Sequence, residues 1–309
     1  MTEMDTCPDR PWLRGIVVPL VTPLRDRDAI DHAGLERLIE RLVASGVHGI
    51  FALGTTGEAP SLSYRLRREL IEHTCRLAAG RVPVLIGITD TSMVESIELG
   101  RFAGEAGADA VVASTPFYFP AGQTELRQYL RGLAAELPLP LMIYNMPSLT
   151  KLCIEPKTIE ELIDVPNIRG VKDSGGDLDY FRRVARLKQQ RPDWSILIGP
   201  EHLLVESLAL GGDGGVHGGA NIFPRLFVDL FSAADCGDSS RVAQLSRIVG
   251  DLQAIYAVGK YDSRFVKATK CALSVLGICS DRMAEPLNRF LAPERQRVAE
   301  VLGRIAIDE

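Results

Sequence analysis

The sequence predicts an α/β protein, a closed (β/α)8 or TIM barrel with a C-terminal helical domain. From residue 16 to about residue 235, short β-branched apolar runs alternate with longer stretches of 3.6-residue periodicity, which is the pattern of repeated βα units. The eight runs are apolar almost throughout, as in parallel strands covered on both faces, and eight such units close a barrel. An open doubly wound sheet is the alternative, although no G-x-G-x-x-G follows the first run.

The expected elements alternate along the chain. Strands are expected at residues 16–21, 49–53, 83–88, 109–114, 140–144, 168–172, 195–199 and 214–218. Helices are expected at residues 31–45, 63–79, 92–106, 124–136, 156–164, 177–190, 201–210 and 222–234. Helix-start signals support several of them, namely Asp31, Ser63, Thr91 or Ser92, Thr124 and Pro156. Three helices end on glycine just before the next strand, at Gly46, Gly107 and Gly211.

The strand signals stop after the segment 236–238, where helical periodicity takes over. Helices are expected at residues 239–257, 262–276 and 294–306, with proline breaks before the last one. The sequence therefore predicts two domains, a barrel with the catalytic site at residues 1–236 and a helical C-terminal domain at residues 237–309.

The composition excludes several classes of partner. A net charge of −5 gives no basic surface of the kind that binds nucleic acid or an anionic membrane. The chain has no apolar run of 18 residues, and its first 14 residues lack the apolar core of a secretory signal. Six cysteines without a C-x-x-C pair are expected to be reduced thiols in a cytoplasmic protein. Five dispersed histidines form no H-x-H or H-E-x-x-H pattern, so we expect neither a metal nor another cofactor.

Lys172 stands at the end of the sixth expected strand, where an apolar run meets polar and glycine residues. The other six lysines lie in helical or loop-like surroundings, where we expect their ammonium groups to be solvated. Burial at a strand end disfavours the charged form and lowers the pKa of a lysine, which turns it into an amine nucleophile. The alternative for Lys172 is an interior salt bridge to a carboxylate of the barrel.

In barrels of this class the active site lies at the C-terminal ends of the strands and in the loops that follow. The second strand is followed by 54–58, Gly-Thr-Thr-Gly-Glu, which could cradle a small carboxylate or form an ordinary capped turn. Tyr118 and Tyr144 stand at the ends of the fourth and fifth strands, where they could relay protons or simply pack. The sixth strand is followed by Ser174. The last two strands end in Gly199-Pro200-Glu201-His202 and Val216-His217-Gly218-Gly219.

These groups form a coherent set for imine chemistry. A lysine amine condenses with a ketone to an imine, whose protonated form stabilises a carbanion at the adjacent carbon. The cradle would hold the carboxylate of a 2-oxo acid, and the tyrosine hydroxyls would move protons while a carbon–carbon bond is cleaved or formed. The residues therefore predict an aldolase that needs no metal.

The chain resembles the family of dihydrodipicolinate synthases and N-acetylneuraminate lyases, which are pyruvate-dependent class I aldolases. The resemblance runs from about residue 15 to beyond residue 280 and is carried by four segments in order: Gly54-Thr55-Thr56-Gly57-Glu58, Thr115-Pro116-Phe117-Tyr118, Tyr144-Asn145-Met146-Pro147 and Gly170-Val171-Lys172-Asp173. It implies a barrel with a helical C-terminal domain, and a homo-oligomer, either a tetramer or a dimer.

The resemblance also implies roles for individual residues. Lys172 would form the imine, Tyr144 would be the general acid/base, and Thr55 would link the tyrosines in a proton relay. Tyr118 would complete the relay by reaching into the site of a neighbouring subunit. The candidates for substrate binding are Gly54, Thr56, Ser174, Gly199, Glu201, His202 and Val216.

The sequence departs from both branches of this family. Dihydrodipicolinate synthases follow the tyrosine with Asn-x-Pro-Ser-Arg-Thr-Gly, in which the arginine grips the carboxylate of the second substrate. Leu149 takes its place here, and Lys151 could compensate only if its loop folded inward. N-acetylneuraminate lyases place hydroxyl and acidic residues after the seventh and eighth strands, whereas Gly218 follows the eighth strand here.

The favoured function is therefore an aldolase that cleaves a 2-keto-3-deoxy sugar acid or 4-hydroxy-2-oxo acid into pyruvate and an aldehyde. Ser174, Glu201 and His202 are the candidate contacts for the aldehyde part. The nearest alternative is a 4-hydroxy-tetrahydrodipicolinate synthase, which condenses pyruvate with aspartate semialdehyde. The alternative from another class is a catalytically silent barrel that binds a 2-oxo acid.

Overall fold

The computed structural model describes residues 10–305. Eight parallel strands close into a barrel in the order β1-β10-β9-β8-β7-β6-β5-β4, so the predicted fold class is confirmed. The chain divides into two compact units. One joins the residues up to Gly15 with Pro83–Val216, and the other joins Ile16–Val82 with the residues from His217 onward. Cys7 and most of the first 14 residues, in which no secretory signal was expected, fall outside the described residues.

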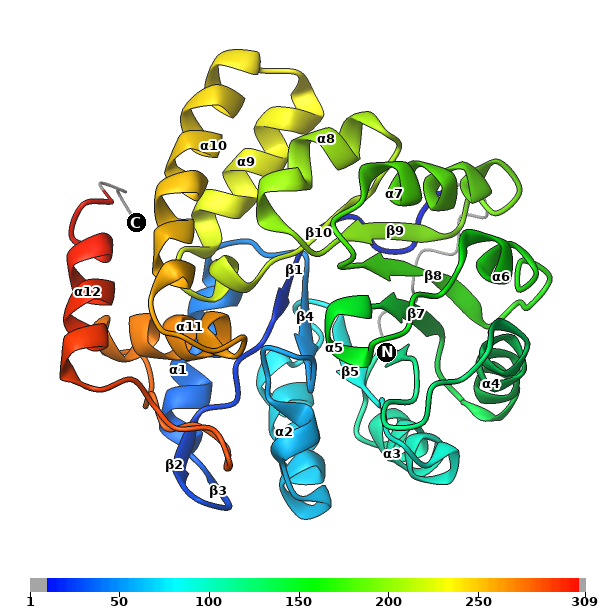
Figure 1. Cartoon of the computed structure of the whole chain (residues 1–309), viewed down its shortest axis with the longest axis horizontal. Coiled ribbons are helices and arrows are strands. Elements are labelled where there is room, and N and C mark those ends of the chain that lie inside the picture. Colours follow the sequence, from blue (N-terminus) through cyan, green and yellow to red (C-terminus); the bar gives the residue numbers. More distant parts are fainter. Residues whose placement is uncertain (1–9, 306–309) are drawn as a thin grey trace. The chain divides into compact units, whose positions relative to one another are not determined.

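The first unit holds the middle of the chain. Its strands are β5 (Val84–Gly87), β6 (Ala110–Ser114), β7 (Leu141–Asn145), β8 (Ile168–Asp173), β9 (Ser195–Ile198) and β10 (Gly214–Val216). Its helices are α3 (Met93–Glu105), α4 (Gln123–Glu136), α5 (Pro147–Thr150), α6 (Pro156–Glu160), α7 (Leu178–Ala185) and α8 (Leu204–Ala209), with the 3₁₀ turns η2 (Arg186–Gln189) and η3 (Glu201–Leu203). Each strand from β5 to β9 pairs in parallel with the next one, and β7, β8 and β9 are seen side by side in Figure 1.

The second unit holds both ends of the described chain. Its strands are β1 (Gly15–Pro19), β2 (Leu24–Asp26), β3 (Ala29–Ile30) and β4 (Gly49–Ala52). Its helices are α1 (His32–Ala44), α2 (Tyr64–Ala78), α9 (Pro224–Cys236), α10 (Ser239–Leu252), α11 (Arg264–Val275) and α12 (Ala292–Leu302), with the 3₁₀ turns η1 (Ala59–Ser61), η4 (Gly218–Asn221) and η5 (Gln253–Ala257). Strand β1 pairs in parallel with β4, and α9 lies beside α10 (Figure 1).

The helices form where apolar residues recur at helical spacing and a polar residue caps the first turn. In α1, Leu35, Leu38, Ile39 and Leu42 are fully buried, so one face of the helix lies in the core. The Asp31 side chain accepts a hydrogen bond from the N–H of Gly34 at 2.9 Å. The start signals Ser63, Ser92 and Pro156 are likewise confirmed.

The predicted start of α4 at Thr124 is wrong. The N-cap is Gly122, and its N–H donates to the Glu125 carboxylate at 2.7 Å. Glycine has no side chain with which to cap the helix, and the Glu125 carboxylate reaches back to the N-cap N–H instead. Thr124 therefore lies inside the first turn of the helix.

The predicted strands agree with the observed ones to within two residues at each end. Several short elements were not predicted: the antiparallel strands β2 and β3, the single-turn helix α5 and the 3₁₀ turns η1 and η4. No strand follows β10 within the described residues, and no helix among them is both long and apolar enough to span a membrane. The domain boundary at residue 236 stays a prediction.

A buried ion pair joins α11 to the turn after β4. Lys270 Nζ donates to Glu58 Oε1 at 2.6 Å, and the side chains are 0% and 1% exposed. The other carboxylate oxygen of Glu58 accepts from the N–H of Ala284 at 2.8 Å. The expectation that every lysine except Lys172 is solvated is therefore wrong, because helical periodicity does not reveal a carboxylate that arrives from a distant turn.

Removal of the Lys270 ammonium should destabilise the protein strongly. Lys270→Met leaves the Glu58 carboxylate buried without its cation, which typically costs about 3–5 kcal/mol. Urea unfolding near neutral pH measures the loss, and Lys260→Met at an exposed lysine is the control, with an expected change within about 0.5 kcal/mol. The double variant Glu58→Gln/Lys270→Met should recover part of the stability. A loss below about 1 kcal/mol in Lys270→Met would contradict the role assigned to the pair.

Candidate active site

Strand pairing brings the two principal predicted residues together. Tyr144 on β7 lies directly opposite Lys172 on β8, and Ser114 on β6 lies opposite Tyr144. Side chains at paired positions of parallel strands point to the same face of the sheet. Ser114, Tyr144 and Lys172 therefore form one row across three neighbouring strands, at the C-terminal ends where barrel enzymes build their sites.

Lys172 is buried against an aromatic ring. It is 4% exposed, and its Nζ lies 3.9 Å from the centroid of the Tyr144 ring. Burial lowers the pKa of Lys172 from its ordinary value, while the contact and hydrogen bond with Tyr144 act in the opposite direction. The net lowering increases the share of neutral amine, which is the nucleophilic form.

Gly170 allows the strand that carries Lys172 to approach its neighbour closely. Its φ is +153°, and a Cβ there would lie 2.1 Å from the Ser195 carbonyl oxygen of β9. Any larger residue would push the two strands apart. The glycine two residues before Lys172 thus helps to fix the position of the amine.

The Asp173 carboxylate, next in sequence after Lys172, points to the opposite face of the sheet from the Lys172 side chain. Asp173 and Asn145 are paired with each other across β7 and β8, one residue further on, so their side chains alternate to the opposite face. Asn145 Nδ2 donates to Asp173 Oδ1 at 2.8 Å, and Asn145 Oδ1 accepts from the N–H of Ile154 at 3.1 Å. Burial raises the pKa of Asp173. This pair holds together the strand ends that carry Tyr144 and Lys172.

Sequence reasoning assigned no role to two hydroxyls at the end of β6. Ser114 and Thr115 are 4% and 1% exposed, and neither hydroxyl has a hydrogen-bond partner among residues 10–305. A buried hydroxyl normally has a partner, so such groups call for an explanation. Ser114 shares its row with Tyr144 and is a candidate substrate contact. Its position at a strand end was visible in the sequence, but its register with Tyr144 was not.

The turn 54–58, which carries the hydroxyls of Thr55 and Thr56 and is called the hydroxyl turn below, belongs to the second unit. Hydrogen bonds and an ion pair within that unit hold it in place. The N–H of Glu58 donates to the Thr55 carbonyl at 3.0 Å, and the Glu58 side chain is held by the buried ion pair. Thr56 is buried and Thr55 is half-buried. A Cβ on Gly54 would lie 2.7 Å from an aromatic ring of β4, so packing alone already requires a glycine there.

The remaining predicted contacts lie at or after the ends of β8, β9 and β10. Gly199 approaches Ser174 closely, because a Cβ on Gly199 would lie 2.1 Å from the Ser174 Oγ. Val216 ends β10 and is buried. Glu201 is buried in the turn η3, whereas the neighbouring His202 is exposed and lies on the surface.

Tyr118 is the most exposed of the four predicted catalytic residues. Its side chain is 86% exposed, its φ is +113°, and its ring packs edge-on against the exposed ring of Phe119 at 5.2 Å. A side chain this exposed does not share the buried surroundings of Lys172.

Comparison with known proteins places this geometry in context. The chain is 35% identical to the 4-hydroxy-tetrahydrodipicolinate synthase of Phenylobacterium zucineum, with 95% of this chain and 96% of the relative covered. It is 32% identical to a probable 2-dehydro-3-deoxy-D-pentonate aldolase of Escherichia coli, with 85% and 87% covered. The structure of a dihydrodipicolinate synthase from Bacteroides thetaiotaomicron is similar to it with a TM-score of 0.91 and 50% identity, over 94% of this chain and 98% of that one.

The barrel and these relatives define the class of the protein, which is a pyruvate-dependent carbon–carbon lyase. Residues 12–305 match the model of the dihydrodipicolinate synthetase family. The chain belongs to that family, as the resemblance of its four segments indicated.

The lowered pKa of Lys172 predicts a specific dependence of stability on pH. Between the folded pKa and the ordinary value of 10.5, the unfolded chain binds more protons at this position than the folded one, so this contribution to stability rises with pH. Lys172→Met removes the cost of burying the amine. The variant should exceed the wild type in stability most at low pH, and the difference should shrink toward about pH 10.

Urea unfolding of both proteins from about pH 6 to about pH 10 measures this difference, in which the other titrating groups cancel. A difference that stays constant over the whole range would show that the pKa of Lys172 is not lowered.

Proposed function

We propose that the chain is a class I aldolase in which the amine of Lys172 forms an imine with the keto group of its substrate. The observation that carries the proposal is the burial of this amine at the end of β8, against the ring of Tyr144. Burial lowers the pKa of Lys172, which increases the share of the neutral amine that can attack a carbonyl carbon. Family membership makes pyruvate the 2-oxo acid that is released or consumed.

In the direction of cleavage, the Nζ lone pair attacks C2 of a 4-hydroxy-2-oxo acid, and the carbinolamine loses one water to give a protonated imine. A base removes the proton of the C4 hydroxyl, and the bond between C3 and C4 breaks. Its electron pair moves through C3 to the imine nitrogen, which gives an enamine and releases the aldehyde. Protonation at C3 and uptake of one water then release pyruvate and restore the amine, so the water lost at the start is returned.

Neighbouring residues would carry the protons and hold the carboxylate. Tyr144 lies beside Lys172, and its hydroxyl would serve as the general acid/base. Thr55 would link the tyrosine hydroxyls, and the buried Thr56 would bind the carboxylate of pyruvate. Ser114 would add a hydrogen bond in the same row, and an unchanged KM for pyruvate in Ser114→Ala would exclude it.

Trapping with borohydride tests the imine directly. In the presence of pyruvate and borohydride, a reduced adduct should accumulate on Lys172 and be located by peptide mass analysis. Lys172→Met should lose the adduct, and Lys260→Met, at an exposed lysine, should keep it. Folded wild-type protein without an adduct on Lys172 would refute the proposed mechanism, whatever the second substrate is.

The residues in and just after helix α5 indicate the chemical class of the second substrate. Leu149 is 43% exposed and carries no charge to grip a second carboxylate. The nearest candidate cation in sequence, Lys151, donates from Nζ to the Ser148 carbonyl at 2.7 Å, so its ammonium is already engaged at the end of the helix. These contacts favour an aldehyde with hydroxyl groups over aspartate semialdehyde. We therefore propose a 2-keto-3-deoxy sugar acid or a related 4-hydroxy-2-oxo acid as the substrate.

The rival function is 4-hydroxy-tetrahydrodipicolinate synthesis. It is favoured by the names of two similar proteins, one 35% and one 50% identical to this chain. The name of the Escherichia coli relative favours the aldolase instead. The two functions share the pyruvate half of the chemistry and differ in the partner of the enamine.

A substrate comparison separates the two functions. Pyruvate release from 2-keto-3-deoxy acids of different length should exceed turnover of pyruvate with aspartate semialdehyde. Leu149→Arg should shift the ratio of kcat/KM toward aspartate semialdehyde by about 10- to 100-fold, because a hydrogen bond to a charged group contributes about 1.5–3 kcal/mol. Leu149→Met is the matched neutral control. Faster turnover of aspartate semialdehyde by the wild type would overturn the assignment of the substrate.

We further propose a homo-oligomer, a tetramer or a dimer. Tyr118 and Phe119 are 86% and 80% exposed and adjoin each other on the loop after β6, an apolar pair that a second subunit would cover. In an oligomer Tyr118 would complete the proton relay of a neighbouring site. Light scattering should give two or four times the mass of 33.8 kDa, and an active monomer would contradict the proposal.

A further inference from the structure

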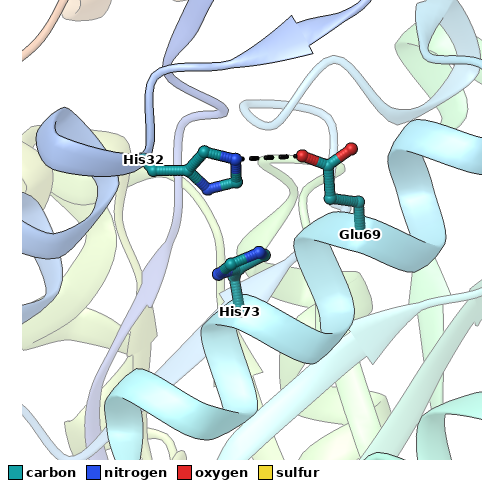
Figure 2. A group of neighbouring side chains, drawn as sticks. All are labelled: His32, Glu69 and His73. Atoms are coloured by element: carbon teal, nitrogen blue, oxygen red, sulfur yellow. Dashed lines mark ion pairs between the residues drawn. The ribbon is translucent and has the colours of Figure 1, made fainter.

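Three side chains with metal-binding groups gather at the start of α1 and in the middle of α2. His32 is the first residue of α1, and Glu69 and His73 lie four residues apart on α2, which places them on one face of that helix. Figure 2 shows the His32 ring and the Glu69 carboxylate meeting above the His73 ring. We call these three residues the histidine–carboxylate cluster. The dispersed histidines of the sequence gave no sign of it, because its members come from two elements.

The distances within the cluster suit a small cation. One ligand atom from each residue can be chosen so that all three lie within 4.8 Å of one another, and His32 Nε2 lies 3.1 Å from Glu69 Oε1. The rings of His32 and His73 have their centroids 4.3 Å apart. A tetrahedral zinc ion binds nitrogen and oxygen at about 2.0–2.2 Å, so its ligand atoms lie roughly 3.3–3.6 Å from each other. Small rotations of the side chains would bring all three to this spacing.

The surroundings hold the carboxylate in place and leave the cluster open to solvent. Arg65 Nη1 donates to Glu69 Oε2 at 2.7 Å, which leaves Oε1 directed at His32. The side chains of His32 and Glu69 are 46% and 24% exposed, so an ion could enter from solvent and complete its coordination with water. An orienting hydrogen bond of this kind is typical of the second shell of a metal site.

One contact in the cluster disfavours the binding of a cation. Arg76 Nη2 lies 2.7 Å from His73 Nδ1, and since a guanidinium can only donate, this nitrogen accepts and the ring is neutral. A neutral ring is the form that binds metal, but the arginine occupies one of its nitrogens and carries a like charge. Arg76 is therefore a competitor, and its removal should favour the ion.

We propose that His32, Glu69 and His73 form a binding site for a divalent transition metal such as Zn²⁺, separate from the chemistry of Lys172. Two imidazole nitrogens and one carboxylate oxygen suit Zn²⁺, Ni²⁺ or Cu²⁺, whereas Mg²⁺ and Ca²⁺ prefer oxygen ligands alone. Because the ligands come from two helices of one unit, the ion would tie the start of α1 to α2. Binding to the folded state alone would stabilise this unit.

Titration calorimetry with ZnCl₂ tests the proposal. Cys153 and Cys236 are exposed free thiols, and Cys7 lies outside the described residues, so serine replaces all three in every protein used. We expect one strong zinc ion per chain. His32→Gln and His73→Gln should each weaken binding by about tenfold or more, a loss at the low end of what even outer-shell changes cause. Glu72→Gln, at the next carboxylate of α2, is the matched control and should change the affinity by less than about threefold.

Two further measurements distinguish a built site from weak surface binding. Arg76→Gln should tighten binding, because it removes the competing guanidinium from His73. Zinc should raise the Tm of the parent protein but not that of His73→Gln. Binding that is unchanged in both histidine variants would overturn the proposal, as would an affinity that Glu72→Gln lowers as much as they do. Borohydride trapping on Lys172 is independent of all these outcomes.

Discussion

A buried amine at the end of a barrel strand is the constraint on which the rest of the site depends. Removing water from Lys172 costs free energy and lowers the pKa of its amine. In the mechanism proposed above, this cost serves catalysis rather than stability, because the neutral amine is the form that attacks a carbonyl carbon. The surrounding features keep the amine where it is. Gly170 lets β8 approach β9, and the pair of Asn145 with Asp173 joins β7 to β8 beyond the row of Tyr144.

The chain buries a second lysine beside a different kind of neighbour. Lys270 forms an ion pair with the carboxylate of Glu58, whereas Lys172 lies against the ring of Tyr144 and has a lowered pKa. The same side chain thus serves as a structural cation in one surrounding and as a candidate nucleophile in the other. The difference comes from the neighbours that the fold supplies, so burial alone does not identify a reactive lysine.

The barrel could be predicted because its strands are covered on both faces and are therefore continuously apolar, with helices of clear periodicity between them. The positions of Tyr144 and Lys172 at strand ends were visible in the sequence, and the family resemblance implied that they act together, whereas their register came from the structure. The strands β2 and β3 and the helix α5 were too short to show a period. Lys270 with Glu58, Ser114 beside Tyr144, and the histidine–carboxylate cluster all depend on contacts between distant segments, which one sequence without a fold does not reveal.

The division of the chain has a consequence for its synthesis on the ribosome. The second unit combines Ile16–Val82 with the residues from His217 onward, so its early half is made long before its late half. Glu58 and Lys270 are 212 positions apart. At about 5–20 residues per second, roughly 10–40 s pass before the partner of the Glu58 carboxylate is made. Because a lone carboxylate resists burial, the hydroxyl turn would stay hydrated until α11 emerges and supplies Lys270.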